Sequence, residues 1–130
     1  MEINWLAVIA AAASSFVLGG LWYGALFGNA WLKAAGLTKE RAMAGNKALM
    51  FGGAFVLSLI SAATFALFLG GDVNAVTGAL YGLCAGLTWV AASYGISYLF
   101  EMRPLSLWVI NGGYHTLQFT LIGLILGAWR

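Results

Sequence analysis

Three polar side chains share one face of the last apolar segment of the sequence. Asn111, His115 and Gln118 lie at positions i, i+4 and i+7, a spacing that brings them together on a helix. His115 falls near the middle of a segment long enough to cross a bilayer, where ionisable groups usually face the protein interior or a watery cavity. Histidine can also exchange protons near neutral pH. The pattern predicts either a binding site or polar path centred on His115, or a neutral histidine that holds helices together.

The rest of the sequence offers little catalytic chemistry. It contains one histidine and one cysteine, Cys84, too few to close a four-ligand zinc site. No paired carboxylates lie within the apolar segments for acid–base work, and no glycine-rich loop precedes a lysine in a phosphate-binding arrangement. His115 could ligate a haem iron across a homodimer, but nothing beyond this one residue supports that. We therefore expect no metal and no cofactor, interpret Cys84 as a packing residue, and rank an enzyme third among the functions.

Hydroxyl side chains in the other apolar segments could complete a polar site. Each is more often bonded back to its own helix, but together they could line a cavity that faces His115. They are Ser14, Ser15, Ser58, Ser61, Thr64, Thr88 and Ser93.

Four apolar segments must position these side chains. Apolar residues make up 62% and charged residues 8% of the chain, against roughly 45–50% and about 25% in soluble proteins, so lipid is the natural solvent. About 20 apolar residues span a bilayer, where the backbone must satisfy its own hydrogen bonds in helices. The sequence predicts an all-α integral membrane four-helix bundle, one domain over residues 1–130, with spans at about 3–27, 48–69, 73–100 and 105–129.

Charged residues predict the orientation. The connection between the second and third spans holds Asp72 and no Lys or Arg. The only basic residue on that side of the membrane is the terminal Arg130. Because cytoplasmic loops are enriched in Lys and Arg, we expect the first and third connections in the cytoplasm and both termini outside a bacterial inner membrane. The net charge of +2 gives no basis for nucleic acid binding. The basic residues of the first and third connections are Lys33, Lys39, Arg41, Lys47 and Arg103.

The first connection is also long enough to hold structure of its own. Asn29 to Ala35 could form a short helix on the membrane surface, and Thr38 is suited to cap a further short helix.

Glycines recur at every fourth position in two of the spans, a pattern that lets a second helix backbone approach closely. The partner could be a helix of the same subunit or of another subunit. We expect a homo-oligomer, with a dimer favoured. The candidate contact residues are Gly20, Gly24 and Gly28 in the first span and Gly78, Gly82 and Gly86 in the third.

The two halves of the chain resemble each other weakly. Tyr23 to Phe27 closes the first span and Tyr94 to Phe100 closes the third, while Gly52-Gly53 and Gly112-Gly113 lie early in the second and fourth. The pattern indicates two helical hairpins related as parallel repeats. Chance similarity among glycine-rich apolar helices is the alternative.

The opening and the end of the sequence resemble the domain of unknown function 1761 family. The opening similarity rests on Asn4 to Val8, Gly19 to Gly28 and Trp31, and the closing one on Asn111 to His115 and Leu126 to Trp129. The resemblance covers nearly the whole chain. It implies a small, mostly bacterial membrane protein with four spans, and it supplies no catalytic or binding residue.

These observations favour two functions. The first is an oligomeric transporter or channel for a small polar solute or ion, with its site near Asn111, His115 and Gln118. The alternative is a structural or accessory subunit that packs through its glycine faces. The first predicts a polar cavity open to at least one side, and the second a dry bundle with a flat outer face of small residues.

Overall fold

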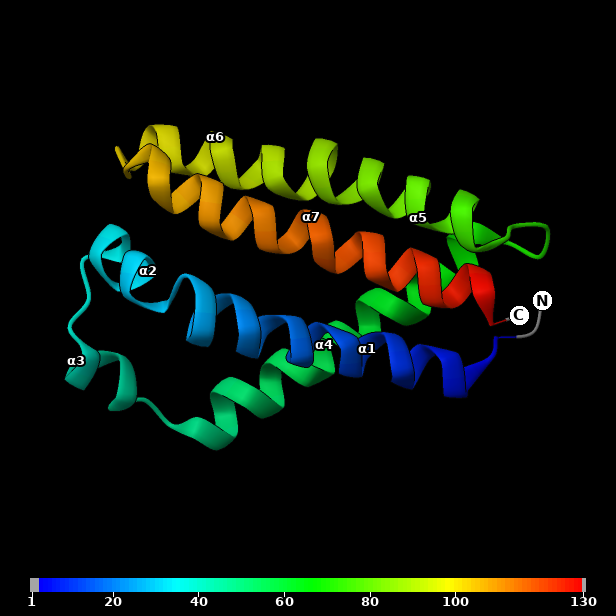
Figure 1. Ribbon diagram of the computed structural model, residues 1–130, viewed down its shortest axis with the longest axis horizontal. Coiled ribbons are helices and arrows are strands. Elements are labelled where there is room, and N and C mark those ends of the chain that lie inside the picture. Colours follow the sequence, from blue (N-terminus) through cyan, green and yellow to red (C-terminus); the bar gives the residue numbers. More distant parts are fainter. Residues whose placement is uncertain (1–2, 130) are drawn as a thin grey trace.

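Four long helices lie alongside one another in the computed structural model, which describes residues 3–129, and the two described chain ends lie at the same end of the molecule (Figure 1). All four are long and apolar enough to cross a membrane, and each end lies within two residues of its predicted position. The predicted all-α bundle is confirmed. The helices are α1 (Trp5–Gly20) with its π-helical continuation η1 (Leu21–Leu26), α4 (Lys47–Leu69), α5 (Ala75–Cys84) continued by the π-helical η2 (Ala85–Ala91) and α6 (Ala92–Phe100), and α7 (Leu105–Ala128).

Side-chain caps set the starts of the helices. Asn4, Asn46 and Asn74 precede α1, α4 and α5, and each side chain accepts a hydrogen bond from a backbone N–H in the first turn, a contact that typically stabilises a helix by about 1 kcal/mol. The first connection holds α2 (Gly28–Ala35) and α3 (Lys39–Met43). Thr38 caps α3 through the Arg41 N–H at 3.1 Å, so both predicted short helices are confirmed.

The second hairpin, α5–η2–α6 with α7, is packed backbone against backbone. A Cβ added to Gly78 would overlap the carbonyl of Gly123, and one added to Gly82 would overlap that of Phe119. On Gly86 it would come within 2.8 Å of the carbonyl oxygen of His115. Only glycine permits this approach. The glycine face of α5 and η2 is therefore covered by α7 of the same chain.

The first hairpin, α1 with α4, is more open. Figure 1 shows α4 crossing α1 and its amino-terminal part leading away from the other helices. The buried residues of α4 all lie in its later turns: Ser58, Ala62, Phe65 and Leu69. In its first turns Leu49 and Phe51 expose 73% and 58% of their surface. The main apolar cluster therefore joins α1, the end of α4, and α7 residues Ile122 and Leu126.

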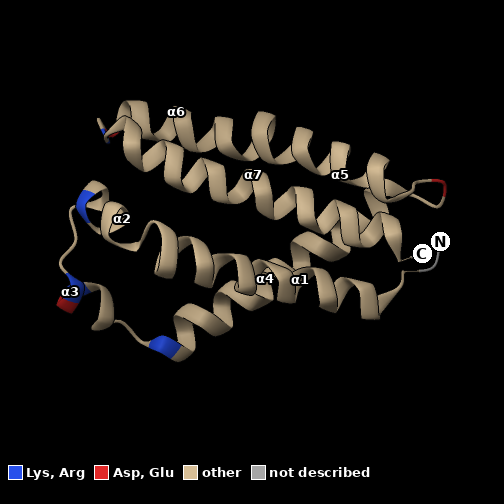
Figure 2. Cartoon of the chain, viewed as in Figure 1, with Lys and Arg blue, Asp and Glu red and all other residues tan. Residues whose placement is uncertain are grey.

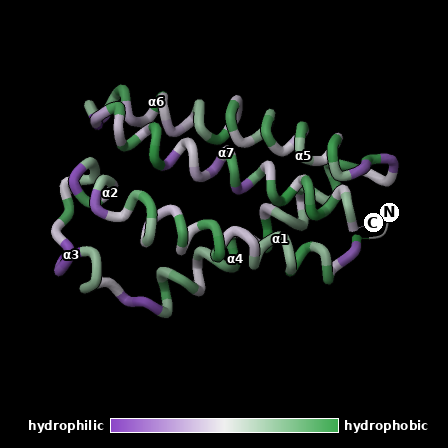
Figure 3. Tube along the Cα trace, in the orientation of Figure 1, coloured by the Kyte–Doolittle hydropathy of each residue, from purple (hydrophilic) through white to green (hydrophobic). Residues whose placement is uncertain are grey.

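Charge is distributed unequally between the two ends of the bundle. Figure 2 shows the basic residues of α2, α3, the start of α4 and the α6–α7 turn at one end, and an acidic residue in the α4–α5 turn at the other. Figure 3 shows long hydrophobic stretches between those ends, with hydrophilic positions partway along α7. Arg130 lies outside the described residues. The described Lys and Arg residues are thus concentrated at the end of the bundle that the sequence predicts to be cytoplasmic.

Candidate polar site

The first polar cluster joins the middle of α7 to α1. The Gln118 Nε2 donates to the Ser15 hydroxyl oxygen at 3.2 Å, and both residues are buried, at 6% and 2% exposure. The Gln118 Oε1 lies 2.7 Å from the His115 Nδ1. Beside them, the Tyr114 hydroxyl donates to the Ser15 carbonyl at 2.9 Å. Gln118 and Ser15, rather than His115, therefore make the side-chain bond between the helices.

The second polar cluster lies at Asn111, nearer the basic end of α7. The Tyr23 hydroxyl of η1 donates to the Asn111 Oδ1 at 2.6 Å, and the Asn111 Nδ2 donates to the Tyr98 hydroxyl of α6 at 2.8 Å. The Trp22 indole N–H also reaches α7, at the Ile110 carbonyl, 2.8 Å away. The Asn111 side-chain amide thus joins three helices, and both its oxygen and its nitrogen have a hydrogen-bond partner.

Aromatic rings connect the two clusters. The Tyr94 ring stacks on the His115 ring with centroids 5.1 Å apart and planes 12° apart, and the Tyr114 ring meets His115 edge-on at 4.9 Å. The Tyr23 ring lies 5.3 Å from that of Tyr114, and Tyr94 lies 5.6 Å from Tyr98. Asn111, His115 and Gln118 therefore belong to one connected network of polar and aromatic contacts rather than to a single three-residue contact.

The hydrogen bond of His115 fixes which ring nitrogen is free. Since the Gln118 Nε2 donates to Ser15, its Oε1 is the acceptor, and the His115 Nδ1 must carry the hydrogen that it receives. In the neutral imidazole the Nε2 then presents a lone pair. No described residue bonds this nitrogen, and no fully buried side-chain nitrogen or oxygen in the described chain lacks a partner. The Nε2 is therefore not fully buried and can accept one more hydrogen bond.

Most of the other candidate hydroxyls bond to their own helices, as is usual for serine and threonine in helices. Ser14 donates to Ala11, Thr64 to Ile60, Thr88 to Cys84 and Ser93 to Trp89, in each case to a backbone carbonyl. Ser15 alone among them also accepts a bond from another helix. The described residues contain no group of three or more His, Cys, Asp or Glu that could hold a metal ion.

The glycines of the first span lie in different surroundings from those of the third. A Cβ on Gly20 or Gly24 would meet nothing within 4 Å, whereas one on Gly28 would lie 2.5 Å from the Tyr23 carbonyl oxygen of its own chain. Gly20 and Gly24 thus lie on an open surface.

Sequence reasoning missed the tyrosines, which supply most of the site. Tyr94 and Tyr98 have the i, i+4 spacing of one helix face, and Tyr114 adjoins His115. The signal was present, but tyrosine at span ends is also the ordinary interfacial residue, which concealed it.

Comparison with known proteins places the chain in a family without an assigned activity. A search of curated proteins and a search of solved structures each found no match. The family model described as "Protein of unknown function (DUF1761)" matches residues 6–127. With nearly every residue of the four helices inside that match, the chain belongs to the DUF1761 family.

Proposed function

We propose that this protein is an oligomeric membrane transporter or channel that binds a small polar solute or ion at the polar site between α1–η1, α6 and α7. The supporting observation is the His115 Nε2, an incompletely buried nitrogen without a hydrogen-bond partner, in a cluster whose two side-chain amides already have partners. A histidine used only to join helices would be expected to bond another helix. The hydrogen bond of His115 instead goes to Gln118 on its own helix.

The chemistry of the site restricts the solute. A lone pair on Nε2 accepts a hydrogen bond, so the solute should present an O–H or N–H donor. The spans contain no Lys or Arg in their interior, so an anion would lack a counter-charge at this depth. A small neutral solute with hydroxyl or amine groups fits the site best, and among cations a proton or a protonated amine can bind the lone pair directly.

The proposed setting is a bacterial inner membrane with the basic end in the cytoplasm. The basic residues gather at the end formed by α2, α3 and the α6–α7 turn (Figure 2), which supports that orientation. The proposed assembly is a homodimer. The open face at Gly20 and Gly24 is where a second helix could approach closely.

An accessory function is the alternative, and the same open surface favours it. Gly20, Gly24, Gly52 and Gly53 all lack a neighbour within 4 Å of an added Cβ, so these positions could receive a helix of another membrane protein. This function would need neither the unpartnered Nε2 nor a solute.

Flux into proteoliposomes separates the two functions. Purified protein would be reconstituted and tested with two probes. Entry of glycerol, the neutral probe, would be measured by osmotic swelling. Entry of protons, the cation probe, would be driven by a proton gradient and measured with an internal pH dye. We expect the wild type to pass at least one probe faster than empty liposomes. His115→Ala should abolish the increment, since it removes the acceptor.

Thr120→Val is the matched control, because the Thr120 hydroxyl bonds only the Thr116 carbonyl of the same helix at 2.7 Å. It should keep the wild-type rate. Wild-type liposomes no more permeable than empty ones to both probes would overturn the transport proposal, as would equal losses in the two variants.

A further inference from the structure

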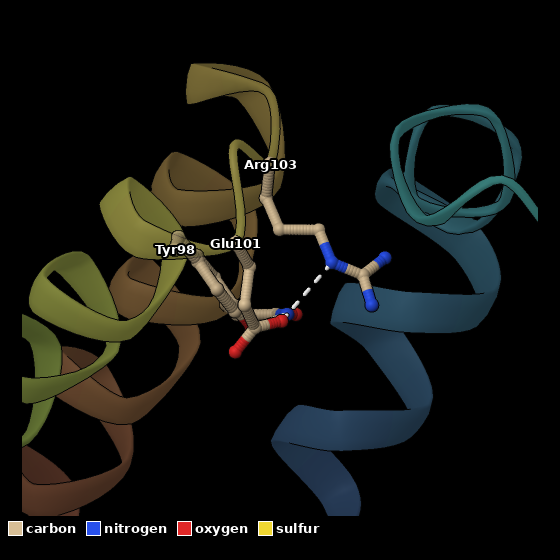
Figure 4. Close-up of polar contacts among 4 residues, drawn as sticks. Tyr98, Glu101 and Arg103 are labelled. Atoms are coloured by element: carbon tan, nitrogen blue, oxygen red, sulfur yellow. Dashed lines mark hydrogen bonds and ion pairs between the residues drawn. The ribbon is translucent and has the colours of Figure 1, made fainter.

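The turn between α6 and α7 leaves an arginine incompletely paired. Met102, the one described non-glycine residue with a positive φ (56°), lies in the turn between Phe100 and Leu105, and the exposed Arg103 follows it. The Arg103 Nε donates to the Glu101 Oε1 at 3.2 Å, and both side chains are about half exposed. Figure 4 shows the Arg103 side chain leaving the turn, with its nitrogen joined to Glu101 and its guanidinium, in this view, on the side where the first hairpin is drawn. Its two terminal nitrogens have no hydrogen-bond partner among the described residues.

A hollow of about 290 Å³ lies directly against this arginine, between α6 and α7. Its lining is almost wholly apolar, and Leu99 and Leu105 at its edges expose 79% and 72% of their surface. Its floor is formed where Gly95 makes room for the Trp108 indole, whose nitrogen would lie 2.9 Å from an added Cβ. The lining residues are Gly95, Tyr98, Leu99, Arg103, Pro104, Leu105 and Trp108.

The position of the hollow fits the boundary between headgroups and hydrocarbon. Gly95 precedes the end of α6 at Phe100 by five residues, which is about 8 Å at the rise of an α-helix. Arg103 is at the end of the bundle where the other basic residues gather (Figure 2). The hollow therefore starts at an arginine at headgroup level and continues into the apolar part of the span.

We infer that this hollow binds an anionic phospholipid, with the phosphate on the Arg103 guanidinium and the start of an acyl chain between Leu99, Leu105 and Trp108. A guanidinium with free N–H groups matches phosphate oxygens in geometry and charge. Basic residues at the cytoplasmic ends of membrane helices attract anionic lipids. The Glu101 carboxylate would repel the phosphate. Binding would therefore require Arg103 to exchange this exposed carboxylate for the lipid phosphate. The apolar lining selects a lipid over free phosphate.

Native mass spectrometry of the intact protein tests this inference. Protein in mild detergent would receive equal amounts of phosphatidylglycerol and phosphatidylcholine with identical acyl chains. The wild type should retain the anionic lipid preferentially. Arg103→Gln should reduce that preference by roughly tenfold, because it removes the charge-assisted hydrogen bonds to the phosphate. Because Arg103 is half exposed and pairs only with Glu101, the variant should fold normally.

Lys47→Gln is the control, because it removes one positive charge at the same end but outside the hollow. It should leave the preference unchanged. Equal losses in the two variants would show nonspecific attraction to the charged end and overturn the inference. Displacement of bound phosphatidylglycerol by inorganic phosphate alone would also overturn it, since a site for free phosphate would not use the apolar lining.

Discussion

The two hairpins of this protein use small residues in different ways. In the second, Gly78 and Gly82 of α5 contact the backbone of α7 so closely that no side chain fits between them. In the first, a Cβ added to Gly20 or Gly24 would meet nothing within 4 Å, and the start of α4 is exposed. The spacing of the glycines is the same in both helices. What differs is the partner, since α7 offers Gly123 and Gly127 on its facing side.

A different kind of contact joins the two hairpins to each other. Along the α1–η1 and α7 pair, hydrogen bonds replace glycine packing. Such bonds link Asn4 to Trp129, Trp22 to Ile110, Tyr23 to Asn111, Tyr114 to Ser15, and Gln118 to Ser15. Such bonds between membrane helices contribute only about 0.6 kcal/mol each on average. The second hairpin should therefore be the rigid part of the molecule, and the joint to the first hairpin the adjustable part.

The largest expected effect comes from filling the glycine contact. Gly82→Leu places a side chain where the Phe119 carbonyl lies, so α5 and α7 must separate or the variant must fail to fold. Overpacking of this kind costs about 3 kcal/mol or more when backbone must move. Unfolding in mixed detergent micelles, followed by circular dichroism, would measure it.

Gly20→Leu provides the matched comparison in the first hairpin, because an added Cβ there has open space. Its effect on unfolding within the chain should stay within about 0.5 kcal/mol, as for other uncrowded surface positions. Equal destabilisation by the two substitutions would contradict the distinction between the hairpins.

The next effect concerns the joint between the hairpins. Asn111→Leu leaves the hydroxyls of Tyr23 and Tyr98 without their amide partner. Losing two interhelical bonds and stranding two half-buried hydroxyls should cost about 2 kcal/mol. The same micelle titration measures it, with Thr120→Val as the control that loses only a bond within its own helix. A cost no larger than that of the control would mean that the hairpins are joined by packing alone.

The sequence predicts the helices well because length, apolarity and caps are local properties. Its predicted span ends fall within two residues of those in the structure, and Thr38 caps α3 as its position before a charged run indicates. The face of α7 that carries the polar site was also predictable, because it depends only on helical periodicity. Each of these conclusions needs no knowledge of a second helix.

Contacts between helices could not be predicted in the same way. The spacing that separates Tyr23 from Tyr94 aligns Gly78, Gly82 and Gly86 with Ala7, Ala11 and Ser15 of α1, and all three of these are buried. A parallel repeat would produce this match, and it places the packing face of α1 on alanine and serine rather than on Gly20 and Gly24. The glycine pattern alone is ambiguous, because close approach also requires small residues on the facing helix.

The smallest expected effect separates the two members of the first polar cluster. Gln118 bonds α1 through Ser15, whereas His115 bonds Gln118 on its own helix. Gln118→Ala should therefore cost about 1 kcal/mol, from a lost interhelical bond and a buried side chain. His115→Ala should cost about half of that, since it loses an intrahelical bond and its stacking on Tyr94.

Double-mutant cycles with Ser15→Ala make this comparison decisive, because they remove the shared cost of truncating each side chain. The coupling between Gln118 and Ser15 should be about 0.6 kcal/mol, the average for a bond between membrane helices. The coupling between His115 and Ser15 should be within error of zero, since no direct hydrogen bond joins the imidazole to the Ser15 side chain. A larger coupling at His115 would mean that its Nε2 has a partner on another helix. In that case the histidine would serve to join helices, and the nitrogen would not be free to receive a solute.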